Sequence, residues 1–205
     1  MLLFRAKIKY PGKRLDIQVW TGKEGDLSVM EEQDLIKKAK AHDSNAFSKL
    51  MQMYGKSMYK VARAILKNDE DVADAMQETA LSCWEKIDTL QKERYFNTWL
   101  IRILINHCNA IYRKKSRYVL DSILPETADE EDAYANVEWM ELLQCLGEKY
   151  RIVIVLYYIE GFQIKDIAKM LQISESAVKQ RMSVARKKME HYYTKGKGVV
   201  IYEKV

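Results

Sequence analysis

The side chains that most often catalyse reactions or bind metals are few and far apart in this chain of 205 residues. They are three histidines and three cysteines: His42, His107, His191, Cys83, Cys108 and Cys145. No two cysteines form a CxxC pair, no histidine stands at metal-ligand spacing from them, and no Gly-rich phosphate loop is present. The sequence therefore predicts no catalytic residue, no metal site and no cofactor. We expect each cysteine to be a small buried residue in a reducing compartment.

The polar residues of segment 163–189 are arranged to bind DNA. Apolar positions predict two helices separated by a tight turn at Gln172 and Ile173, with Ser174 capping the second helix. Opposite its apolar stripe, the second helix carries side chains that can bind phosphates or read base edges: Ser176, Lys179, Gln180, Ser183, Arg186 and Lys187. The sequence therefore predicts a DNA-reading helix-turn-helix; the alternative is an amphipathic helix with a solvated basic face.

A second basic row lies on a predicted helix over 98–117. Arginine and asparagine recur at helical spacing opposite the apolar face, in a form suited to a nucleic acid backbone: Arg102, Asn106, Asn109, Arg113 and Arg117. The preceding segment mixes cations, aromatics and an amide, which could hold an unstacked base: Lys92, Arg94, Tyr95, Phe96 and Asn97. The alternative for the aromatics is a place in the core, which we expect for Phe96.

The predicted helix over 70–87 has an acidic exposed side. It carries Asp71, Asp74, Gln77, Glu78 and Glu85 opposite a stripe that includes Val72, Thr79 and Cys83. This side could dock a basic partner or could simply be solvated.

The elements that position these residues are predicted to be helices. Apolar residues make up 48% of the chain, with only 8 Gly and 2 Pro, and this favours a packed helical fold. Period-3.6 patterns predict helices over 31–41, 44–66 (capped by Ser44), 70–87, 98–117, 148–160, 163–171 and 174–192. We expect an all-α protein of two helical domains, 30–117 and 137–192, joined by an acidic linker at 118–136 and followed by a tail at 193–205.

Three segments in order resemble the extracytoplasmic-function group of RNA polymerase sigma factors. DVADAMQETALSCWEKI at 71–87 is similar to the family's polymerase-binding helix, TWLIRILINHCNAIYRKKSR at 98–117 to the segment after it, and 146–189 to its second conserved domain. The resemblance covers most of 31–192. It implies a region 2-like bundle and a region 4-like helix-turn-helix, an alternative sigma factor that initiates transcription, and three partners: core polymerase, promoter DNA and an anti-sigma factor.

The resemblance also implies roles for the polar rows. Asp71, Asp74, Gln77 and Glu78 would dock on the polymerase clamp helices. The row on 98–117, with Asn106 foremost, and the 91–97 segment would engage and melt the minus-ten element. Lys179, Gln180 and Ser183, with their neighbours, would read the minus-thirty-five element, and the acidic linker would thread the basic interior of polymerase. The sequence departs from the family pattern at Ala110, Ala177, Gln172 and Val184, which affects the promoter sequence rather than the class.

Two other functions fit the sequence less well. A helix-turn-helix repressor or activator would explain 146–189 but would leave the polar faces of 71–117 unused. An enzyme is not supported by the histidines and cysteines. No apolar run reaches the length of a membrane span, and the first residues are too rich in Lys and Arg for a signal peptide. We therefore expect a cytoplasmic protein without membrane insertion.

Residues 1–29 have a different pattern. Apolar residues alternate with polar ones on both sides of Pro11-Gly12, which predicts a possible β-hairpin. Such a hairpin would need a helix or Val199–Tyr202 to pack against. The family pattern begins near Met30, and Lys23-Glu24-Gly25 can be encoded by a ribosome-binding sequence. Residues 1–29 are thus either an added element or a translated leader.

Overall fold

The computed structural model describes the backbone of residues 3–10, 13–20, 27–119, 143 and 145–196, and side chains within 31–115, 143 and 145–192. The predicted linker 118–136 falls almost wholly outside these residues, as do the Pro-Gly turn and the end of the tail. None of the described helices is both long and apolar enough to cross a membrane.

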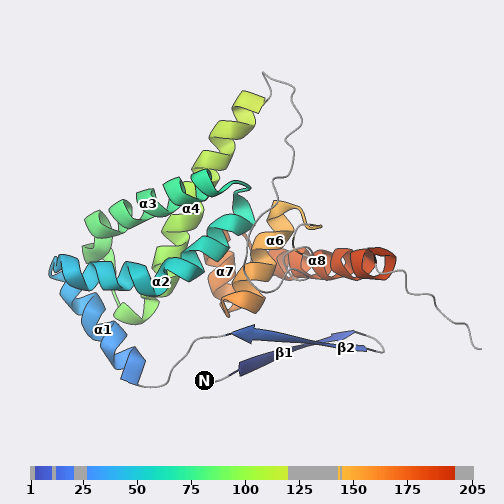
Figure 1. Cartoon of the computed structure of the whole chain (residues 1–205), viewed down its shortest axis with the longest axis horizontal. Coiled ribbons are helices and arrows are strands. Elements are labelled where there is room, and N and C mark those ends of the chain that lie inside the picture. Colours follow the sequence, from blue (N-terminus) through green and yellow to red (C-terminus); the bar gives the residue numbers. More distant parts are fainter. Residues whose placement is uncertain (1–2, 11–12, 21–26, 120–142, 144, 197–205) are drawn as a thin grey trace, which may run out of the picture.

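Helices α1 to α4 make up the N-terminal helical unit (Figure 1). They are α1 (Leu27–Lys40), α2 (Ser44–Ile65), α3 (Asp69–Lys86) and α4 (Phe96–Val119). Two short 3-10 turns, η1 (Ile87–Thr89) and η2 (Glu93–Tyr95), connect α3 to α4. Helix α2 pairs with α1, α3 and α4, and α3 packs along α4. The core therefore lies at the junction of α2, α3 and α4.

The inner faces of these helices are the predicted apolar stripes. Phe96, Leu100 and Leu104 have no exposed surface. Burial of side chains of this size stabilises the fold by about 1.5–3 kcal/mol each. Ile101 and Ile105 are buried too, so α4 is covered on more than one side.

One predicted helix cap was wrong. The sequence predicts Ser44 as the cap of the second helix, but Ser44 is the first helical residue and Asp43 is the cap. The Asp43 carboxylate accepts hydrogen bonds from the backbone amides of Asn45 and Ala46, at 2.9 and 3.1 Å. Asp43 follows His42, whose φ of 59° ends α1. Propensity alone could not separate two adjacent capping residues.

The C-terminal helical unit is the predicted helix-turn-helix with one helix before it. Its elements are α6 (Glu148–Ile154), a π-helical turn η3 (Val155–Ile159), α7 (Ile164–Leu171) and α8 (Glu175–Gly196). Helix α8 runs four residues beyond the predicted end at 192. Its inner side chains are buried as predicted: Val178, Met182, Ala185 and Met189.

The turn between α7 and α8 is stabilised from the backbone. Gln172 adopts a left-handed conformation with φ 54° and ψ 43°, and the amide of Ile173 donates to the carbonyl of Ala168 at 3.0 Å. A left-handed residue at this place is the usual way to end a helix, and glycine adopts it without strain. The Ser174 hydroxyl accepts from the amide of Ala177 at 3.1 Å, as expected of a cap.

The two helical units pack against each other. Helix α6 and turn η3 contact α2, and α7 contacts α4. Buried side chains of both units form one continuous cluster, so the two predicted domains share a boundary of packed side chains.

The N-terminal segment contains two antiparallel strands, β1 (Leu3–Tyr10) and β2 (Lys13–Trp20). Their register pairs Phe4 with Val19 and Tyr10 with Lys13. The pairing with Val199–Tyr202 that the sequence suggested lies outside the described residues.

Candidate nucleic-acid interface

The outer face of α8 is exposed over residues 176–187. The six polar residues that the sequence places there are all exposed: Ser176, Lys179, Gln180, Ser183, Arg186 and Lys187. Because Val178 and Met182 are buried against the rest of the unit, the outer face is held in a fixed orientation. A helix presented in this way can enter a major groove.

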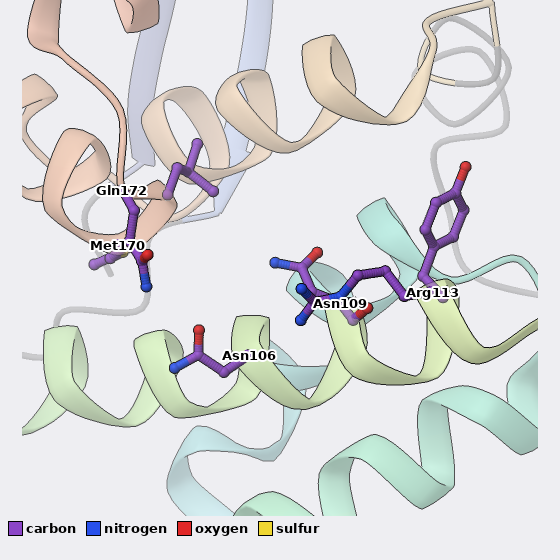
Figure 2. A pocket seen from close by; sticks show the side chains of 7 residues that line it. Asn106, Asn109, Arg113, Met170 and Gln172 are labelled. Carbon is purple, nitrogen blue, oxygen red and sulfur yellow. Dashed lines mark hydrogen bonds between the residues drawn. The ribbon is translucent and has the colours of Figure 1, made fainter. Parts of the chain in front are cut away.

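The polar row on α4 lies partly opposite helix α7. Arg102, Asn106 and Arg113 are exposed, and Asn109 is half-buried. Asn106, Asn109 and Arg113, together with Tyr112, line a hollow of about 250 Å³. Its opposite wall is Met170 and Leu171 of α7 and the turn residue Gln172. Figure 2 shows the side chains of Asn106, Asn109 and Arg113 on α4, and those of Met170 at the end of α7 and Gln172 just after it, around one space. The side chain of Arg117 lies outside the described residues.

The loop before α4 is fastened to α1. The Lys40 ammonium donates to the carbonyl of Leu90 at 2.9 Å and lies 3.6 Å from the carboxylate of Glu93. A hydrogen bond from its own backbone, together with Lys40, lowers the pKa of the Glu93 carboxyl. Lys40 thus holds in place the loop that carries Lys92, Glu93 and Arg94. These three residues and Gln33 line a second hollow, of about 320 Å³.

The aromatic residues Tyr95, at the end of this loop, and Phe96, at the start of α4, differ in burial. Phe96 is buried, as expected, whereas Tyr95 is 49% exposed with the Arg94 guanidinium 4.8 Å from its ring centre. The side-chain oxygen of Asn97 is buried and has no hydrogen-bond partner among the described residues. The loop therefore offers an exposed aromatic and cations close to the start of the α4 row.

The acidic face of α3 contains three of the four predicted docking residues. Asp74, Gln77 and Glu78 are exposed. Asp71 is not exposed as predicted: it is 8% exposed, and its carboxylate lies 2.8 Å from the ammonium of Lys115 on α4. The helical period placed Asp71 on the outer side, but α4 passes over the first turn of α3 and covers it.

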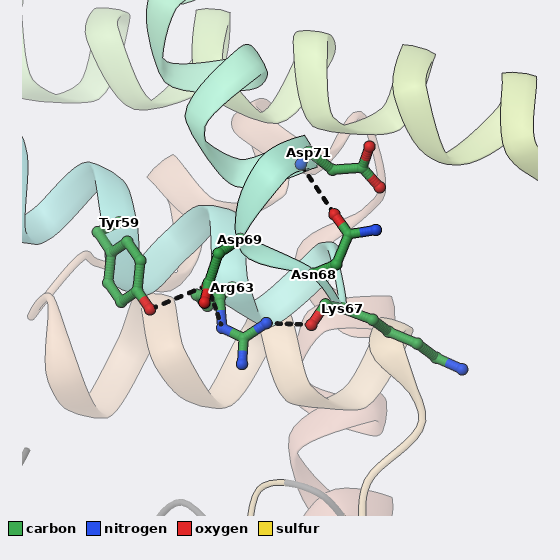
Figure 3. Close-up of polar contacts among 6 residues, drawn as sticks. All are labelled: Tyr59, Arg63, Lys67, Asn68, Asp69 and Asp71. Carbon is green, nitrogen blue, oxygen red and sulfur yellow. Dashed lines mark hydrogen bonds and ion pairs between the residues drawn. The ribbon is translucent and has the colours of Figure 1, made fainter. Parts of the chain in front are cut away.

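The start of α3 is held by α2. The Asn68 side chain caps the helix by accepting from the amide of Asp71 at 2.8 Å. The Tyr59 hydroxyl donates to Asp69 at 3.2 Å. Figure 3 shows this contact and the Arg63 guanidinium beside both Asp69 and the carbonyl of Lys67. Further along, Ser82 and His107 are hydrogen-bonded at 2.9 Å between α3 and α4. The acidic face and the basic row are therefore parts of one rigid pair of helices.

The side chains of the three cysteines pack in or against the hydrophobic core. Cys83 and Cys108 are buried, and burial raises the pKa of each thiol to about 12. Cys145 is half-buried, and burial raises the pKa of its thiol as well. Thiols with raised pKa are poor nucleophiles and poor metal ligands.

Sequence reasoning missed the residues that connect distant elements. Lys40 contacts Leu90, 50 positions away, and Ser57 contacts Glu160, 103 positions away. His42 contacts Asp88, 46 positions away. No periodicity or motif marks such pairs, because they depend on how the helices cross.

A helix with an exposed basic face, beside a helical pair with one acidic and one basic face, is an arrangement typical of one class of protein, the DNA-binding transcription factors. Two family profiles match the chain: Sigma-70 region 2 over residues 50–118 and Sigma-70, region 4 over residues 136–189. The ECF RNA polymerase sigma factor SigW of Bacillus subtilis is 31% identical over 170 residues, which are 74% of this chain and 90% of SigW. The chain therefore belongs to the sigma-70 family, in its extracytoplasmic-function group, and is an alternative sigma factor that initiates transcription.

Solved structures agree with this fold. CnrH of Cupriavidus metallidurans is 30% identical over 178 residues, 78% of this chain and 93% of CnrH. Its structure, solved with the cytosolic domain of CnrY, has a TM-score of 0.59 and covers 80% of this chain and 97% of that one at 27% identity. RpoE of Bartonella quintana, solved with the anti-sigma factor NepR, has a TM-score of 0.63 at 23% identity and covers 72% and 96% of the two chains. Matches to both conserved regions do not favour a repressor or activator that acts without polymerase.

Proposed function

We propose that the three exposed faces divide the work of promoter recognition. Asp74, Gln77 and Glu78 of α3 dock on core RNA polymerase. The α4 row, with Asn106 foremost, and the loop before it capture the minus-ten strand. The outer face of α8 reads the minus-thirty-five element. The observation that carries the proposal is that α3 and α4 pack together and expose opposite charges outward.

The proposed contact with polymerase rests on the negative charges of the α3 face. Asp74 and Glu78 place two carboxylates on neighbouring turns of α3. The side chain of Leu81 beside them is 53% exposed. Together they form a surface suited to a basic partner with an apolar centre. Asp71 has a different role in this proposal. Its ion pair with Lys115 fixes α3 against α4.

The first test reverses the docking charges. Asp74→Arg with Glu78→Arg is expected to abolish co-purification with core polymerase, because like charges at an interface cost several kcal/mol. Glu31→Arg with Asp34→Arg, on the exposed side of α1, makes the same change in net charge and is the control. Retention of core polymerase by the first variant at the level of the control would contradict the assignment.

The minus-ten role of the loop has its own support. Gln33, Lys92 and Arg94 line the hollow, and the Arg94 guanidinium lies 4.8 Å from the centre of the exposed ring of Tyr95. A base taken out of its stack needs an aromatic surface and hydrogen-bonding groups, and a strand needs cations for its phosphates. Tyr95→Ala is therefore expected to weaken binding of single-stranded minus-ten DNA by the polymerase holoenzyme about tenfold, whereas Tyr95→Phe keeps the ring and is expected to bind as wild type.

An anti-sigma factor is the proposed regulator. The Bartonella RpoE was solved with the anti-sigma factor NepR, and CnrH was solved with the cytosolic domain of CnrY. Affinity purification of the chain from its native cells before induction is expected to recover a further protein besides polymerase subunits. Recovery of polymerase subunits alone, before and after induction, would contradict this regulation.

We also infer that the protein acts in the cytoplasm and has no catalytic site of its own. Its proposed partners, polymerase and chromosomal DNA, are in the cytoplasm of a bacterium. The raised pKa of its thiols and the structural contacts of His42 and His107 are consistent with non-catalytic roles.

A further inference from the structure

Helix α1 forms one wall of the hollow of about 320 Å³ beside the loop before α4. Gln33 contributes this wall, and Lys92, Glu93 and Arg94 of the loop contribute the other. The two cations can only donate hydrogen bonds, and the carboxylate can only accept them. The exposed amide of Gln33 has a donor and an acceptor side by side. Gln33 is therefore the one lining residue whose side chain can pair with a donor and an acceptor at once.

Gln33 shares its face of α1 with Lys37 and Lys40. These lysines follow it by four and seven residues, which are about one and two turns of a helix. The Lys40 ammonium donates to the carbonyl of Leu90 at 2.9 Å and lies 3.6 Å from the carboxylate of Glu93. Helix α1 also contacts both 3-10 turns of the loop, η1 and η2. The face that carries Gln33 is therefore the face that α1 turns toward the loop.

The end of α1 fastens the loop at a second place. His42 Nε2 lies 3.2 Å from the carboxylate of Asp88 on η1. The His42 ring also meets the Trp84 ring edge-on, with the ring centres 5.3 Å apart. Together with Lys40, His42 holds both 3-10 turns against α1. The two walls of the hollow are thus pre-organised, which lowers the entropic cost of binding a ligand between them.

The lysines of α1 also offset the one negative charge of the hollow. A hydrogen bond from its own backbone lowers the pKa of the Glu93 carboxyl, and the charges of Lys40 and Lys37 lower it further. The carboxylate is therefore ionised but has two cations beside it. Lys92 and Arg94, both exposed, add two more. The hollow can accept a base without repelling the phosphates on either side of it.

We propose that Gln33 reads one base of the minus-ten strand and prefers adenine there, and that Lys40 is a positioning residue that holds the opposite wall in place. The proposal rests on the proposed role of the loop in capturing this strand. An unstacked adenine presents the N6 donor and the N7 acceptor side by side, and these match a glutamine amide. Guanine presents two acceptors on the same edge and matches lysine or arginine instead.

A change of base preference tests the reading role of Gln33. Polymerase holoenzyme containing each variant is used to select from a pool of randomised single-stranded oligonucleotides. Wild type is expected to enrich adenine about tenfold at one position. Gln33→Ala is expected to lose that enrichment at this position alone, and Gln33→Lys to replace adenine by guanine. Gln52→Lys, which changes an exposed amide of α2 in the same way, is the matched control.

A loss of affinity alone would not support the reading role. If Gln33→Ala weakens binding equally for all four bases, or if wild type, Gln33→Ala and Gln33→Lys select the same bases, the proposal is overturned. Damage to the fold cannot imitate the expected result, because it does not exchange one preferred base for another. Thermal unfolding of the exposed-site variants confirms that they fold.

The positioning role of Lys40 has a separate test. Lys40→Ala is expected to weaken binding of the selected oligonucleotide about tenfold and to reduce the adenine preference at the position that Gln33 reads, while the preferences at other positions remain. Lys40→Arg keeps the donor and the charge and is expected to restore both. Lys38→Ala is the matched control, because Lys38 is exposed and pairs with Asp34 on another side of α1. Unchanged affinity and preference in Lys40→Ala would overturn this role.

Tyr95→Ala separates this proposal from the proposed function of the loop. If Tyr95→Ala weakens strand binding but the Gln33 variants select as wild type does, the loop captures the strand and the reading role of Gln33 is wrong. If Tyr95→Ala and every Gln33 variant bind and select as wild type does, the loop does not capture the strand, and both proposals are overturned.

Discussion

Helices α4 and α8 are built on the same plan but stand in different surroundings. Each has a buried apolar stripe and an opposite row of cationic, amide or hydroxyl side chains. The polar row of α8 is exposed throughout, whereas that of α4 lies partly under α7 and contains the half-buried Asn109. The comparison teaches that an amphipathic pattern fixes which face of a helix is packed, but not whether the other face is free.

The largest expected effect tests the packed side of α4. Leu104→Ala removes a side chain with no exposed surface and is expected to lower the free energy of unfolding by about 2–5 kcal/mol. Arg102→Ala, on the exposed side of the same helix, is expected to change it by less than about 0.5 kcal/mol. Urea denaturation followed by circular dichroism measures both. Equal effects would mean that the two faces of α4 have been assigned wrongly.

The next test separates the two polar rows by the step that each serves. Lys179→Ala with Gln180→Ala is expected to reduce transcription about tenfold or more at promoters that need a minus-thirty-five element, since a good base contact contributes about 1–3 kcal/mol. Lys49→Ala with Gln52→Ala, a chemically matched exposed pair on α2, is the control. Run-off transcription with core polymerase measures the effect.

Asn106→Ala is expected to act at a later step than the α8 pair. It should leave binding of the closed promoter nearly unchanged and reduce strand opening, seen as lost permanganate reactivity of unpaired thymines. Asn45→Ala, on an exposed position of α2, is the matched control. Normal opening by the Asn106 variant would remove the distinction between the two rows.

A smaller effect on stability is expected at the helix caps, where the observed caps of the two units can be compared with the wrongly predicted one. Asp43→Ala and Ser174→Ala each remove a side chain that accepts from helix amides, and each is expected to cost about 1 kcal/mol of unfolding free energy. Ser44→Ala should cost much less, because Ser44 lies inside α2. Thermal unfolding of the three variants ranks them, and a cost for Ser44→Ala equal to that for Asp43→Ala would contradict the observed cap.

The smallest effect concerns the turn of the helix-turn-helix. Gln172→Gly is expected to raise unfolding free energy by up to about 1 kcal/mol, since glycine adopts the left-handed conformation of this residue without strain. Gln52→Gly, within α2, is expected to lower it by about 1 kcal/mol. Opposite signs in calorimetry support the assigned turn; a loss of stability with both changes would contradict it.

The sequence predicted the helices well where their apolar period was long and regular. Val178, Met182, Ala185 and Met189 are buried as predicted, because a sustained stripe leaves one possible inner face. Helix ends were less certain. Helix α1 begins at Leu27 rather than near residue 31, and α8 continues to Gly196, since neither end has a strong stop signal in the sequence.

What the sequence determined by itself was the class of the protein and the chemistry of its polar rows. Residue types and spacing along single helices carry that information, and the family matches agree with it. Only the tertiary structure decided that Asp71 is paired with Lys115, that Lys40 holds the loop before α4, and that Glu160 joins α2. These contacts arise where helices cross at angles set by the packing of many side chains, and no local pattern records which residues will meet there.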